Sequence, residues 1–362
     1  MTVSTRWLHA GGRRVPLLAG PDAASELPRA LAEVGFEGRV FVVADEQAMQ
    51  LHGERLPEAP VLCIAGDEAN KTLDQVSRVW DWLVDQGAQR RDAVLAFGGG
   101  VVCDLAGFAA ACFLRGIGLV NVPTTLLAQV DASVGGKTGI NHARGKNLIG
   151  AFYQPLCVVA DTGVLGSLSP RAFAAGMAEV AKMGMILDAD LFATLEQQAE
   201  QLIPTAAEAL APLIARSIEL KAEIVERDER ESGERMLLNY GHTVGHALEA
   251  AAGYGTLLHG EAVAVGMHAA ALIAYELGVL ERLAAERQAA LLARLHLPST
   301  WADVQTEDVW ARIARDKKRA GTVQRWILAH AVGEARIHED VPEALARRAV
   351  ETVTARPENP GL

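Results

Sequence analysis

Hydrophobic and polar positions follow different patterns in the first and second parts of the chain. In the first part, short and almost uniformly apolar runs end at Asp, Gly or Pro-Thr-Thr, and helical patterns such as residues 73–86 lie between them. Such runs are typical of strands buried on both faces, and their alternation with helices predicts an α/β fold with a parallel, doubly wound (Rossmann-like) sheet. The predicted strands cover residues 39–44, 60–65, 93–97, 118–122 and 158–160.

Beyond Pro170 the spacing of apolar residues becomes helical, with few β-branched runs. Because 362 residues are too many for one average core, we expect two domains. These are an α/β domain over residues 1–165 and a mostly α-helical domain over residues 166–362, with the active site in the cleft between them. The predicted helices of the second part cover residues 171–186, 206–228, 236–252 and 260–277.

Composition narrows the class of protein. Half of the residues are hydrophobic, 22% are charged and the formal net charge is −11, so we expect neither nucleic acid nor a membrane as a partner. An anionic substrate would need a local basic pocket. The four cysteines form no CxxC pair, residues 1–12 lack the features of a signal peptide, and the apolar stretch 262–275 is too short to span a bilayer. We expect a cytoplasmic enzyme.

Three glycines follow the predicted strand 93–97 and precede a helical pattern. Glycine lets a backbone approach a pyrophosphate, and a helix N-terminus supplies free N–H groups, so Gly98–Gly100 fits a dinucleotide-binding loop. A tight strand-to-helix turn explains the same pattern equally well. Asp45 ends an earlier strand, where it either holds a ribose hydroxyl or caps a helix, and capping is the better explanation of this residue alone. Lys71, in the segment 66–71, is either solvated or within reach of a cofactor phosphate.

Residues 129–147 combine glycines with basic side chains in an otherwise acidic protein. Gly135–Thr138 resembles the end of a Walker A loop, but Asp131 stands where that motif needs its first glycine, which excludes a P-loop. A flexible backbone with Lys and Asn donors suits a phosphate or carboxylate, and we favour such an anion site over a solvated basic loop. Its basic residues are Lys137, His142, Arg144 and Lys146.

Three helical segments carry side chains that can bind a metal. Glu179 and Lys182 share a helix face at i, i+3, His242 and His246 share one at i, i+4, and His259 follows a glycine-rich turn. One Glu with two His leaves room for substrate oxygens, which is the usual arrangement of catalytic Zn²⁺. Any one of these histidines alone is better explained as structural, but their occurrence together favours a metal site.

Eleven short segments spread over nearly the whole chain carry a family resemblance. They are Gly98–Asp104, Pro123–Asp131, Ser133–Asn141, Gly145–Asn147, Gly150–Pro155, Ala178–Lys182, Glu219–Lys221, Asp228–Glu231, Leu238–Thr243, Leu258–Ala262 and Asp316–Lys318. In this order they resemble the 3-dehydroquinate synthases, a family of sugar-phosphate cyclases. The resemblance implies a homodimer with an N-terminal NAD-binding domain and a C-terminal helical metal domain.

The resemblance also implies roles for individual residues. The metal, Zn²⁺ or Co²⁺, is bound by Glu179, His242 and His259. NAD is held by Asp45, Gly66, Asp67, Glu68, Ala69, Asn70, Lys71, Gly100, Val101, Val102, Cys103, Asp104, Thr124, Thr125, Lys137, Lys146, Val164, Leu165, Gly166 and Ser167. The catalytic set is His246, Glu231, Lys182, Lys137 and Asn147, of which His246 and Glu231 match positions assigned to proton transfer.

Substrate contacts are implied for a largely basic set of residues. Taken alone, the charge runs 227–235 and 316–318 are better explained as solvated helix faces. The resemblance instead makes some of their members substrate ligands, and it takes Arg115 from the partner subunit. The full set is Arg115, Asp131, Lys137, Asn147, Lys182, Lys221, Arg235, Asn239, Lys317 and Lys318.

The implied activity is that of a carbon–oxygen lyase of the shikimate pathway, which leads to aromatic amino acids. It converts 3-deoxy-D-arabino-heptulosonate 7-phosphate to 3-dehydroquinate and phosphate by transient NAD oxidation, phosphate elimination, re-reduction and intramolecular aldol closure. Three alternatives stay open: a sugar-phosphate cyclase for a substrate without a carboxylate, a metal-dependent polyol dehydrogenase of the same fold, and a non-catalytic sensor of NAD or metal. Arg235 argues against the first, accumulation of NADH would mark the second, and binding without turnover would mark the third.

Overall fold

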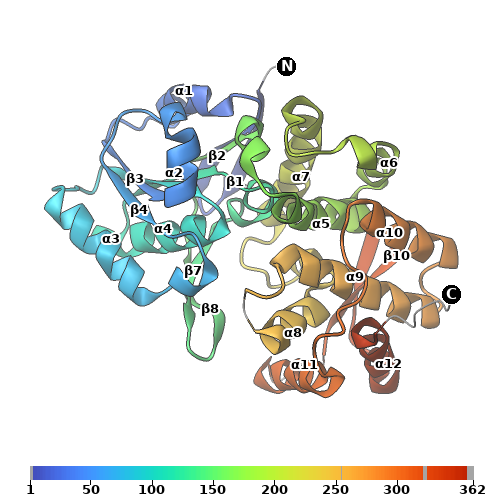
Figure 1. The fold of residues 1–362 in the computed structure, drawn as a ribbon. Helices are drawn as coiled ribbons and strands as arrows, with labels where there is room; N and C mark the ends of the chain where they lie inside the picture. The colour runs from blue at the N-terminus through green and yellow to red at the C-terminus, as the bar shows by residue number, and fades with distance from the viewer. Residues whose placement is uncertain (1–2, 254, 321–323, 357–362) are drawn as a thin grey trace. The chain divides into compact units, whose positions relative to one another are not determined.

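The computed structural model describes residues 3–253, 255–320 and 324–356, with the backbone alone for residues 316–320. The chain divides into two compact units (Figure 1). Unit 1 comprises residues 1–169 and 203–230, and unit 2 comprises residues 170–202 and 231–362. Helix α7 (Ala207–Arg227) therefore belongs to unit 1. The predicted single boundary at residue 165 would have assigned this helix to the second domain. Within the described ranges, no helix is long and apolar enough to cross a membrane.

The core of unit 1 is a seven-stranded sheet. Six strands run parallel to their neighbours, which confirms the predicted doubly wound arrangement, and β1 adds an antiparallel edge through a hairpin with β2. Gly11 and Gly12 form the hairpin turn with φ of 59° and 71°, the left-handed backbone that a two-residue hairpin turn favours. The strand order is β1 (Ser4–Ala10), β2 (Arg13–Gly20), β9 (Cys157–Asp161), β6 (Gly118–Pro123), β5 (Ala93–Gly98), β3 (Val40–Asp45) and β4 (Val61–Ile64).

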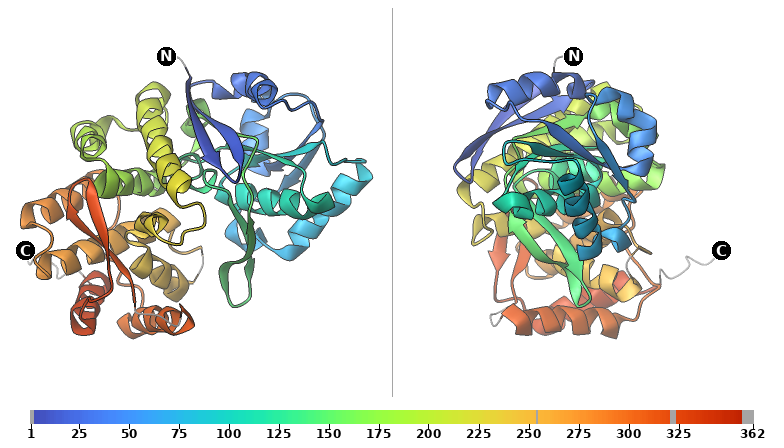
Figure 2. Two further views of the ribbon diagram at one scale, coloured as in Figure 1. Left: turned by 180° about the vertical axis from the view of Figure 1, so that it is seen from behind. Right: turned by 90° about the vertical axis from the view of Figure 1, so that its left-hand side faces the viewer.

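Alternate residues of the central strands pack on opposite faces of this sheet. Phe41 and Val43 of β3 belong to an apolar cluster with α3 and α4, whereas Val42 and Ala44 belong to a second cluster with α1 and α2. Helix α7 packs against β1 and β2 (Figure 2). Helices thus cover both faces, as a doubly wound fold requires. Their bounds are α1 (Leu27–Glu33), α2 (Glu46–His52), α3 (Leu73–Asp85) and α4 (Gly100–Cys112).

The strand order reverses between β3 and β5. The chain passes from β3 to β4 on one side, and the next strand, β5, lies on the other side of β3. In open parallel sheets, ligands bind outside the carboxyl ends of the strands at such a switch point. The two ends are Asp45 and Gly98, so the topology selects the edge that carries the predicted dinucleotide loop.

Residues 129–147, which the sequence predicts to form an anion site, fold into regular structure. A π-helical turn, η5 (Ala128–Ala132), precedes an antiparallel hairpin of β7 (Lys137–His142) and β8 (Gly145–Phe152), which extends away from the sheet (Figure 1). The hairpin packs closely on α4, since a Cβ atom at Gly107 would lie only 2.5 Å from Thr138 Cγ2. The basic residues of this segment are therefore held on a defined scaffold.

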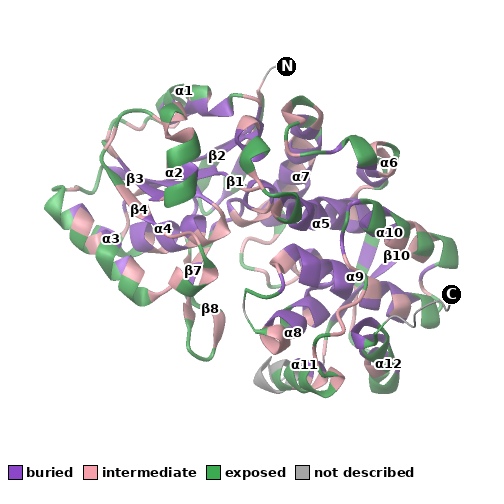
Figure 3. Ribbon diagram, viewed as in Figure 1, coloured by how far each residue is buried: buried purple, intermediate pink, exposed green. Residues whose placement is uncertain are grey.

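Unit 2 is mostly helical, as predicted, and is built around α9 (His259–Glu276). Helix α9 is buried along most of its length (Figure 3) and packs against α5, α8, α10, α12 and β10. A small antiparallel hairpin, β10–β11, was not predicted. The remaining elements are α5 (Pro170–Leu187), α6 (Ala189–Gln198), α8 (His242–Ala252), α10 (Arg282–Arg294), α11 (Thr306–Ala320), β10 (Trp326–Ala331), β11 (Glu334–His338) and α12 (Glu343–Thr354).

The predicted helix over 236–252 is wrong in its first part. Residues 234–239 form a short 3₁₀ helix, and α8 begins only after Gly241, whose φ of 80° interrupts the helix. The other predicted helices correspond to α5, α7 and α9. The short helices are η1 (Ala23–Glu26), η2 (Gly53–Arg55), η3 (Glu68–Asn70), η4 (Phe113–Arg115), η6 (Thr162–Ser167), η7 (Ala199–Gln201) and η8 (Glu234–Asn239).

Candidate active site

Three histidines of unit 2 come together at the starts of two helices. His242 is the first residue of α8, His246 lies one turn further along it, and His259 is the first residue of α9. Their ring centroids are 5.1–5.7 Å apart, and one ligand nitrogen of each lies within 4.8 Å of the other two. Imidazoles at this spacing can share one divalent cation.

Two glycines of α9 bring the ligand-bearing elements into contact. A Cβ atom at Gly260 would lie 1.8 Å from the backbone oxygen of Ala175 in α5, and one at Gly266 would lie 1.8 Å from the backbone oxygen of Gly241. No larger residue fits at either position without moving a backbone. These contacts bring the start of α9 against the start of α8 and against the turn of α5 that precedes Glu179.

Glu179 of α5 lies beside two of the histidines. Its side chain is fully buried, and its Oε1 is 3.8 Å from His242 Nε2 and 3.7 Å from His259 Nε2. These distances are too long for hydrogen bonds. Two ligands of one tetrahedral Zn²⁺ lie about 3.4 Å apart when each bond is about 2.1 Å, so a contraction of a few tenths of an ångström would suffice. The second oxygen, Oε2, forms an ion pair with Lys182.

Outer partners orient the two imidazoles toward Glu179. His242 Nδ1 lies 3.1 Å from the backbone oxygen of Tyr240, and His259 Nδ1 lies 3.0 Å from Glu249 Oε2. Both contacts suit an Nδ1–H donor, which leaves each Nε2 with its lone pair toward the site. Tyr240 is itself fixed, because its buried hydroxyl donates to Gln288 Oε1 at 2.8 Å. No pattern in the sequence singled out Tyr240, Glu249 or Gln288.

The electrostatics of the site favour neutral imidazole at His242. Burial, together with the charge of Lys182 and the neighbouring His246 and His259, lowers the pKa of His242 well below 6.5. Neutral imidazole is the form that binds metals. At neutral pH, His242 is therefore ready to accept a cation without first losing a proton.

Two ligand sets share His242 and His259, and they differ in the third member. His246 completes a three-histidine set, whereas Glu179 completes the predicted set. Among the described residues, Glu179 Oε1 has no hydrogen-bond partner although the side chain is fully buried, and Oε2 has only the ion pair with Lys182. A buried carboxylate in that state is costly unless it is paired or coordinates a metal. Both donor sets thus fit a divalent cation, and Glu179 as the third ligand stays a prediction.

Other predicted residues of unit 2 lie just before α8. Arg235 is only 2% exposed, and Asn239 Nδ2 donates to Glu231 Oε1 at 2.7 Å. Glu231 has φ of 59°, an uncommon backbone for glutamate. Lys317 and Lys318 belong to the backbone of α11, but their side chains lie outside the described part of the chain.

In unit 1, the predicted dinucleotide residues gather at the switch point. Asp45 Oδ1 accepts a hydrogen bond from Ala48 N at 2.9 Å, so this aspartate does cap α2, and a ribose contact stays a prediction. A Cβ atom at Gly66 would lie 2.2 Å from Asp45 Oδ2, and one at Gly98 would lie 3.1 Å from Asp45 Cβ. Both glycines are therefore required by the packing around Asp45.

The glycine loop also packs against the predicted threonines after β6. Thr124 N donates to the backbone oxygen of Gly98 at 2.9 Å, and a Cβ atom at Gly99 would lie 3.2 Å from Thr125 Cγ2. Helix α4 begins at Gly100, so its free N–H groups start at this loop. The loop is both a tight turn and a suitable site for a pyrophosphate.

Lys71 is buried in a polar network rather than solvated. It is 3% exposed, and its ammonium donates to Asp104 Oδ2 and to Asn147 Oδ1, each at 2.5 Å. Asn141 joins the network, because its side chain donates to Glu68 Oε1 at 2.7 Å and accepts from Asn147 N at 2.9 Å. Burial raises the pKa of Asp104, and the charge of Lys71 opposes that rise. The network thus joins residues predicted to bind the cofactor with residues predicted to bind the substrate. Asn141, which also belongs to it, was not among the predicted site residues.

A second lysine joins two predicted substrate residues. Lys221 of α7 is 5% exposed, and its ammonium donates to both the backbone oxygen and Oδ1 of Asp131 in η5, each at 2.5 Å. The return of α7 to unit 1 thus places Lys221 beside η5. The contact supports the predicted pairing of these residues in one site.

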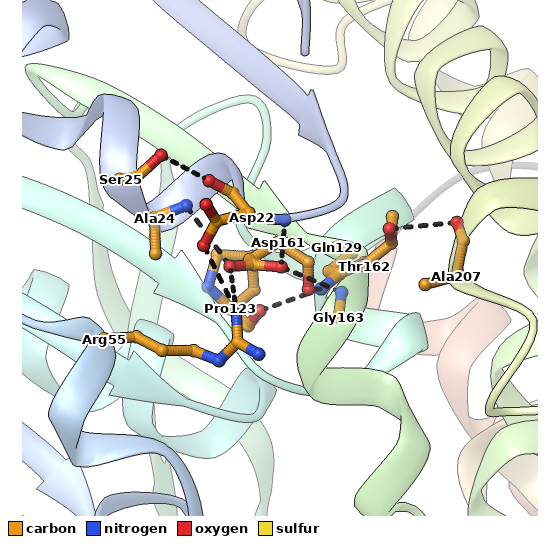
Figure 4. A network of polar contacts seen from close by, with 10 residues as sticks. All are labelled: Asp22, Ala24, Ser25, Arg55, Pro123, Gln129, Asp161, Thr162, Gly163 and Ala207. Carbon is orange, nitrogen blue, oxygen red and sulfur yellow. Dashed lines mark hydrogen bonds and ion pairs between the residues drawn. The ribbon is translucent and has the colours of Figure 1, made fainter. Parts of the chain in front are cut away.

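Asp161 lies in a network of polar contacts (Figure 4), just before the last predicted cofactor segment, Val164 to Ser167. It is 1% exposed and accepts from Gly163 N at 2.8 Å and from Arg55 Nη1 at 3.1 Å, as well as from two backbone N–H groups near η1. This carboxylate caps η6, which holds the segment. Its position directly after a strand was the available sequence signal.

The remaining predicted residues lie on or near the hairpin. Lys137 begins β7 and Lys146 lies in β8. Arg115 ends η4 with φ of 69°, directly after Leu114 with φ of 49°. Left-handed backbone at two consecutive non-glycine residues is uncommon and concentrates at functional sites.

Comparisons with known proteins agree over both units. Residues 61–175 match the family described as "3-dehydroquinate synthase N-terminal", and residues 176–319 match "3-dehydroquinate synthase C-terminal". A 3-dehydroquinate synthase from Halorhodospira halophila is 46% identical over 354 residues, covering 96% of this chain and 99% of the relative. One from Cereibacter sphaeroides is 43% identical over 370 aligned positions, covering 98% and 100%.

Solved structures show the same fold. A 2-epi-5-epi-valiolone synthase from Streptomyces hygroscopicus subsp. jinggangensis, with NAD⁺ and Zn²⁺ bound, aligns with a TM-score of 0.86 at 29% identity, covering 94% of this chain and 96% of that one. A 2-deoxy-scyllo-inosose synthase complexed with carbaglucose-6-phosphate, NAD⁺ and Co²⁺ aligns at 0.85 and 27% identity, covering 97% and 100%. A glycerol dehydrogenase from Schizosaccharomyces pombe aligns with a TM-score of 0.64 at 17% identity, covering 93% of this chain and 88% of that one, and shows the fold alone.

Proposed function

The chain belongs to the 3-dehydroquinate synthase family, and from this premise we propose that it converts 3-deoxy-D-arabino-heptulosonate 7-phosphate to 3-dehydroquinate and phosphate. It is an NAD- and metal-dependent lyase of this family. The proposed course is transient oxidation, phosphate elimination, re-reduction and intramolecular aldol closure. The observation that carries the proposal is 46% identity over 96% of the chain, together with the grouped Glu179, His242 and His259.

Glu179, His242 and His259 would hold Zn²⁺ or Co²⁺, and the carboxyl-end edge of the unit 1 sheet would hold NAD. When bound, the cation supplies Lewis acidity to substrate hydroxyls, and NAD supplies a reversible hydride acceptor. Glu249 keeps His259 in the tautomer that ligates. Asp45 and the glycines around it shape the dinucleotide edge.

Buried basic residues explain how an acidic protein would hold an acidic substrate. Lys182 and Arg235 are 1% and 2% exposed, and Lys221 is 5% exposed. We propose that Lys137 and Asn147 hold the phosphate and that Arg235 with a lysine holds the carboxylate, because fixed and desolvated cations bind such groups strongly. Asp131, Asn239, Lys317 and Lys318 complete the proposed substrate set.

Proton transfer is proposed for His246 and Glu231. The ring of His246 lies 5.1 Å from that of His242, centroid to centroid, so it stands beside the proposed ligands. Glu231 accepts a hydrogen bond from Asn239, which fixes its carboxylate. These two contacts support the proposed acid–base roles.

The proposal assigns a role to each unit and an assembly to the chain. Unit 1 would be the NAD-binding domain and unit 2 the metal-binding domain. A homodimer, in which Arg115 serves the neighbouring subunit, is supported by the exposed apolar residues Leu148, Ile149 and Phe152 on β8, which are 56%, 37% and 43% exposed. We propose a cytoplasmic enzyme, and the cleft between the two domains stays a prediction.

The test is phosphate release from the heptulosonate phosphate with catalytic NAD⁺, before and after a chelator. We expect one phosphate per 3-dehydroquinate, no net NADH, and loss of turnover on chelation with recovery on adding Zn²⁺ or Co²⁺. Accumulation of NADH in step with substrate would instead identify a polyol dehydrogenase. Turnover of substrates without a carboxylate, at equal rates, would identify a different sugar-phosphate cyclase.

A further inference from the structure

A cavity of about 600 Å³ lies in unit 1 at the amino ends of the parallel strands. Gly118, which begins β6, and Leu156, which directly precedes β9, line it, as does Arg91 just before β5. Each strand rises about 3.3 Å per residue, so a six-residue strand separates this edge from the carboxyl-end edge by roughly 16–20 Å. The cavity, here called the basic pocket, is therefore distinct from the candidate active site.

The basic pocket concentrates positive charge in a chain with a net charge of −11. Four guanidinium groups line it, those of Arg13, Arg14, Arg90 and Arg91. The one carboxylate in its lining, Glu33, already pairs with an arginine of its own helix. Within the described part of the chain, none of the four guanidinium groups forms an ion pair with a carboxylate.

Many arginines elsewhere pair with a carboxylate. Arg39, Arg287 and Arg294, for example, each pair with an aspartate or glutamate at 2.6–2.8 Å. Since acidic residues outnumber basic ones by 45 to 34, a cluster of four arginines without such partners is unusual for this surface. Their mutual repulsion would be relieved by a bound anion.

Aromatic side chains hold two of these arginines in place. Arg14 Cζ lies 4.5 Å from the centroid of the Trp7 ring, and Arg13 Cζ lies 5.7 Å from that of Tyr153. Tyr153 is fixed in turn, because its hydroxyl donates to the backbone oxygen of Ile117 at 2.6 Å. Arg13 Nη1 also donates to the backbone oxygen of Gln154 at 3.5 Å. A guanidinium held over a ring still has N–H groups for a planar oxyanion, and less side-chain entropy is lost when the anion binds.

We propose that the basic pocket binds a small organic anion carrying at least two phosphate or carboxylate groups, at a site separate from catalysis. Its volume lies within the range of small-molecule sites, about 300–1,000 Å³. Phosphate and carboxylate share the oxygen geometry that guanidinium recognises, so binding of both kinds must be tested.

The test titrates the NAD⁺- and Zn²⁺-loaded protein with fructose 1,6-bisphosphate or with terephthalate, at constant ionic strength, by calorimetry. The variants are R90Q/R91Q, the independent R13Q, and the control R78Q, which removes an exposed arginine of α3 outside the pocket. We expect the wild-type chain and R78Q to bind one equivalent of at least one anion beyond any bound by the active site. R90Q/R91Q and R13Q should bind it at least about tenfold more weakly, with kcat and KM for the heptulosonate phosphate unchanged.

Three results would overturn the proposal. The first is no binding of either anion by the wild-type chain at millimolar concentration. The second is equal binding by the wild type and both pocket variants while circular dichroism shows all of them folded. The third is a change of oligomeric state in R90Q/R91Q, because a second copy of the chain would then be what covers the pocket. Preference for one of the two anions would decide between a phosphate and a carboxylate ligand.

Discussion

Replacing Gly98 by alanine tests whether the switch point of the sheet holds the dinucleotide. The added Cβ would lie 2.7 Å from Val102 Cγ2, 2.8 Å from Val102 Cβ and 3.1 Å from Asp45 Cβ. Val102 is in the first turn of α4, so the methyl group must push the helix start away from the end of β3. These are the elements proposed to hold the pyrophosphate and a ribose hydroxyl of NAD.

The size of the effect follows from the crowding. Overpacking by one methyl group in a tight site typically costs about 1–3 kcal/mol. In the free protein, small shifts of α4 and Asp45 relieve most of this strain, but bound NAD requires the original positions. Binding of NAD⁺ must then restore the strained positions at a cost of about 1–3 kcal/mol, which lowers the affinity for NAD⁺ by about 5- to 150-fold.

Gly118 supplies a matched control at the other end of the sheet. A Cβ atom there would lie 2.8 Å from Ala93 Cβ and 2.9 Å from Leu156 Cδ1, which is nearly the same crowding. G118A should lower the midpoint of thermal unfolding to a similar degree as G98A, but it should leave the NAD⁺ dissociation constant, measured by calorimetry, within about twofold of wild type. Equal NAD⁺ affinity for G98A and G118A would refute the assignment of the cofactor edge.

Two other substitutions test single interactions. K71M leaves the partly buried Asp104, whose side chain is 19% exposed, without its cation, so the free energy of unfolding should fall by about 1–3 kcal/mol at neutral pH. Because burial raises the pKa of Asp104, this loss should shrink in urea titrations at pH 5, and an equal loss at both pH values would contradict the reasoning. H330Q tests the effect of burying His330, which lowers the pKa of its imidazole below 6.5. As the pH falls, the unfolded chain therefore takes up a proton at this position before the folded chain does. Wild-type stability should therefore decline as pH falls below 6.5, and the thermal midpoint of H330Q should decline less between pH 7.5 and 5.5 than that of wild type.

The sequence predicted the central strands because they are buried on both faces. Runs such as residues 93–97 are apolar at every position, which few other structures require. The β1–β2 hairpin escaped prediction because only two of the seven residues of β1 are buried, and its polar residues Ser4, Thr5, Arg6 and His9 resemble a loop. The β7–β8 hairpin escaped for the same reason, since its pairing depends on backbone hydrogen bonds and not on an apolar pattern.

The return of α7 to unit 1 could not be predicted from its periodicity. An amphipathic pattern identifies which face of a helix is buried, but not which core covers that face. The choice depends on tertiary contacts, such as that of Lys221 with Asp131. The same limit applies to domain boundaries drawn from composition alone.

At the candidate site, sequence spacing predicted the ligand types better than their surroundings. The i, i+4 pair of histidines and the separate Glu179 were visible as metal-binding residues. Glu249 was not, because an acidic residue in a helix usually faces solvent, and only the fold shows that it is 4% exposed and beside His259. Which of Glu179 and His246 is the third ligand depends on positions that spacing along the chain does not fix.

Metal content of two variants tests the proposed ligand set most directly. E179Q and H246Q, purified in parallel and dialysed against micromolar free Zn²⁺, would be analysed by mass spectrometry for zinc per chain. The account predicts about one equivalent in wild type and in H246Q, and less than about a tenth of an equivalent in E179Q. A full equivalent in E179Q, with zinc lost from H246Q, would contradict it and assign the cation to the three histidines.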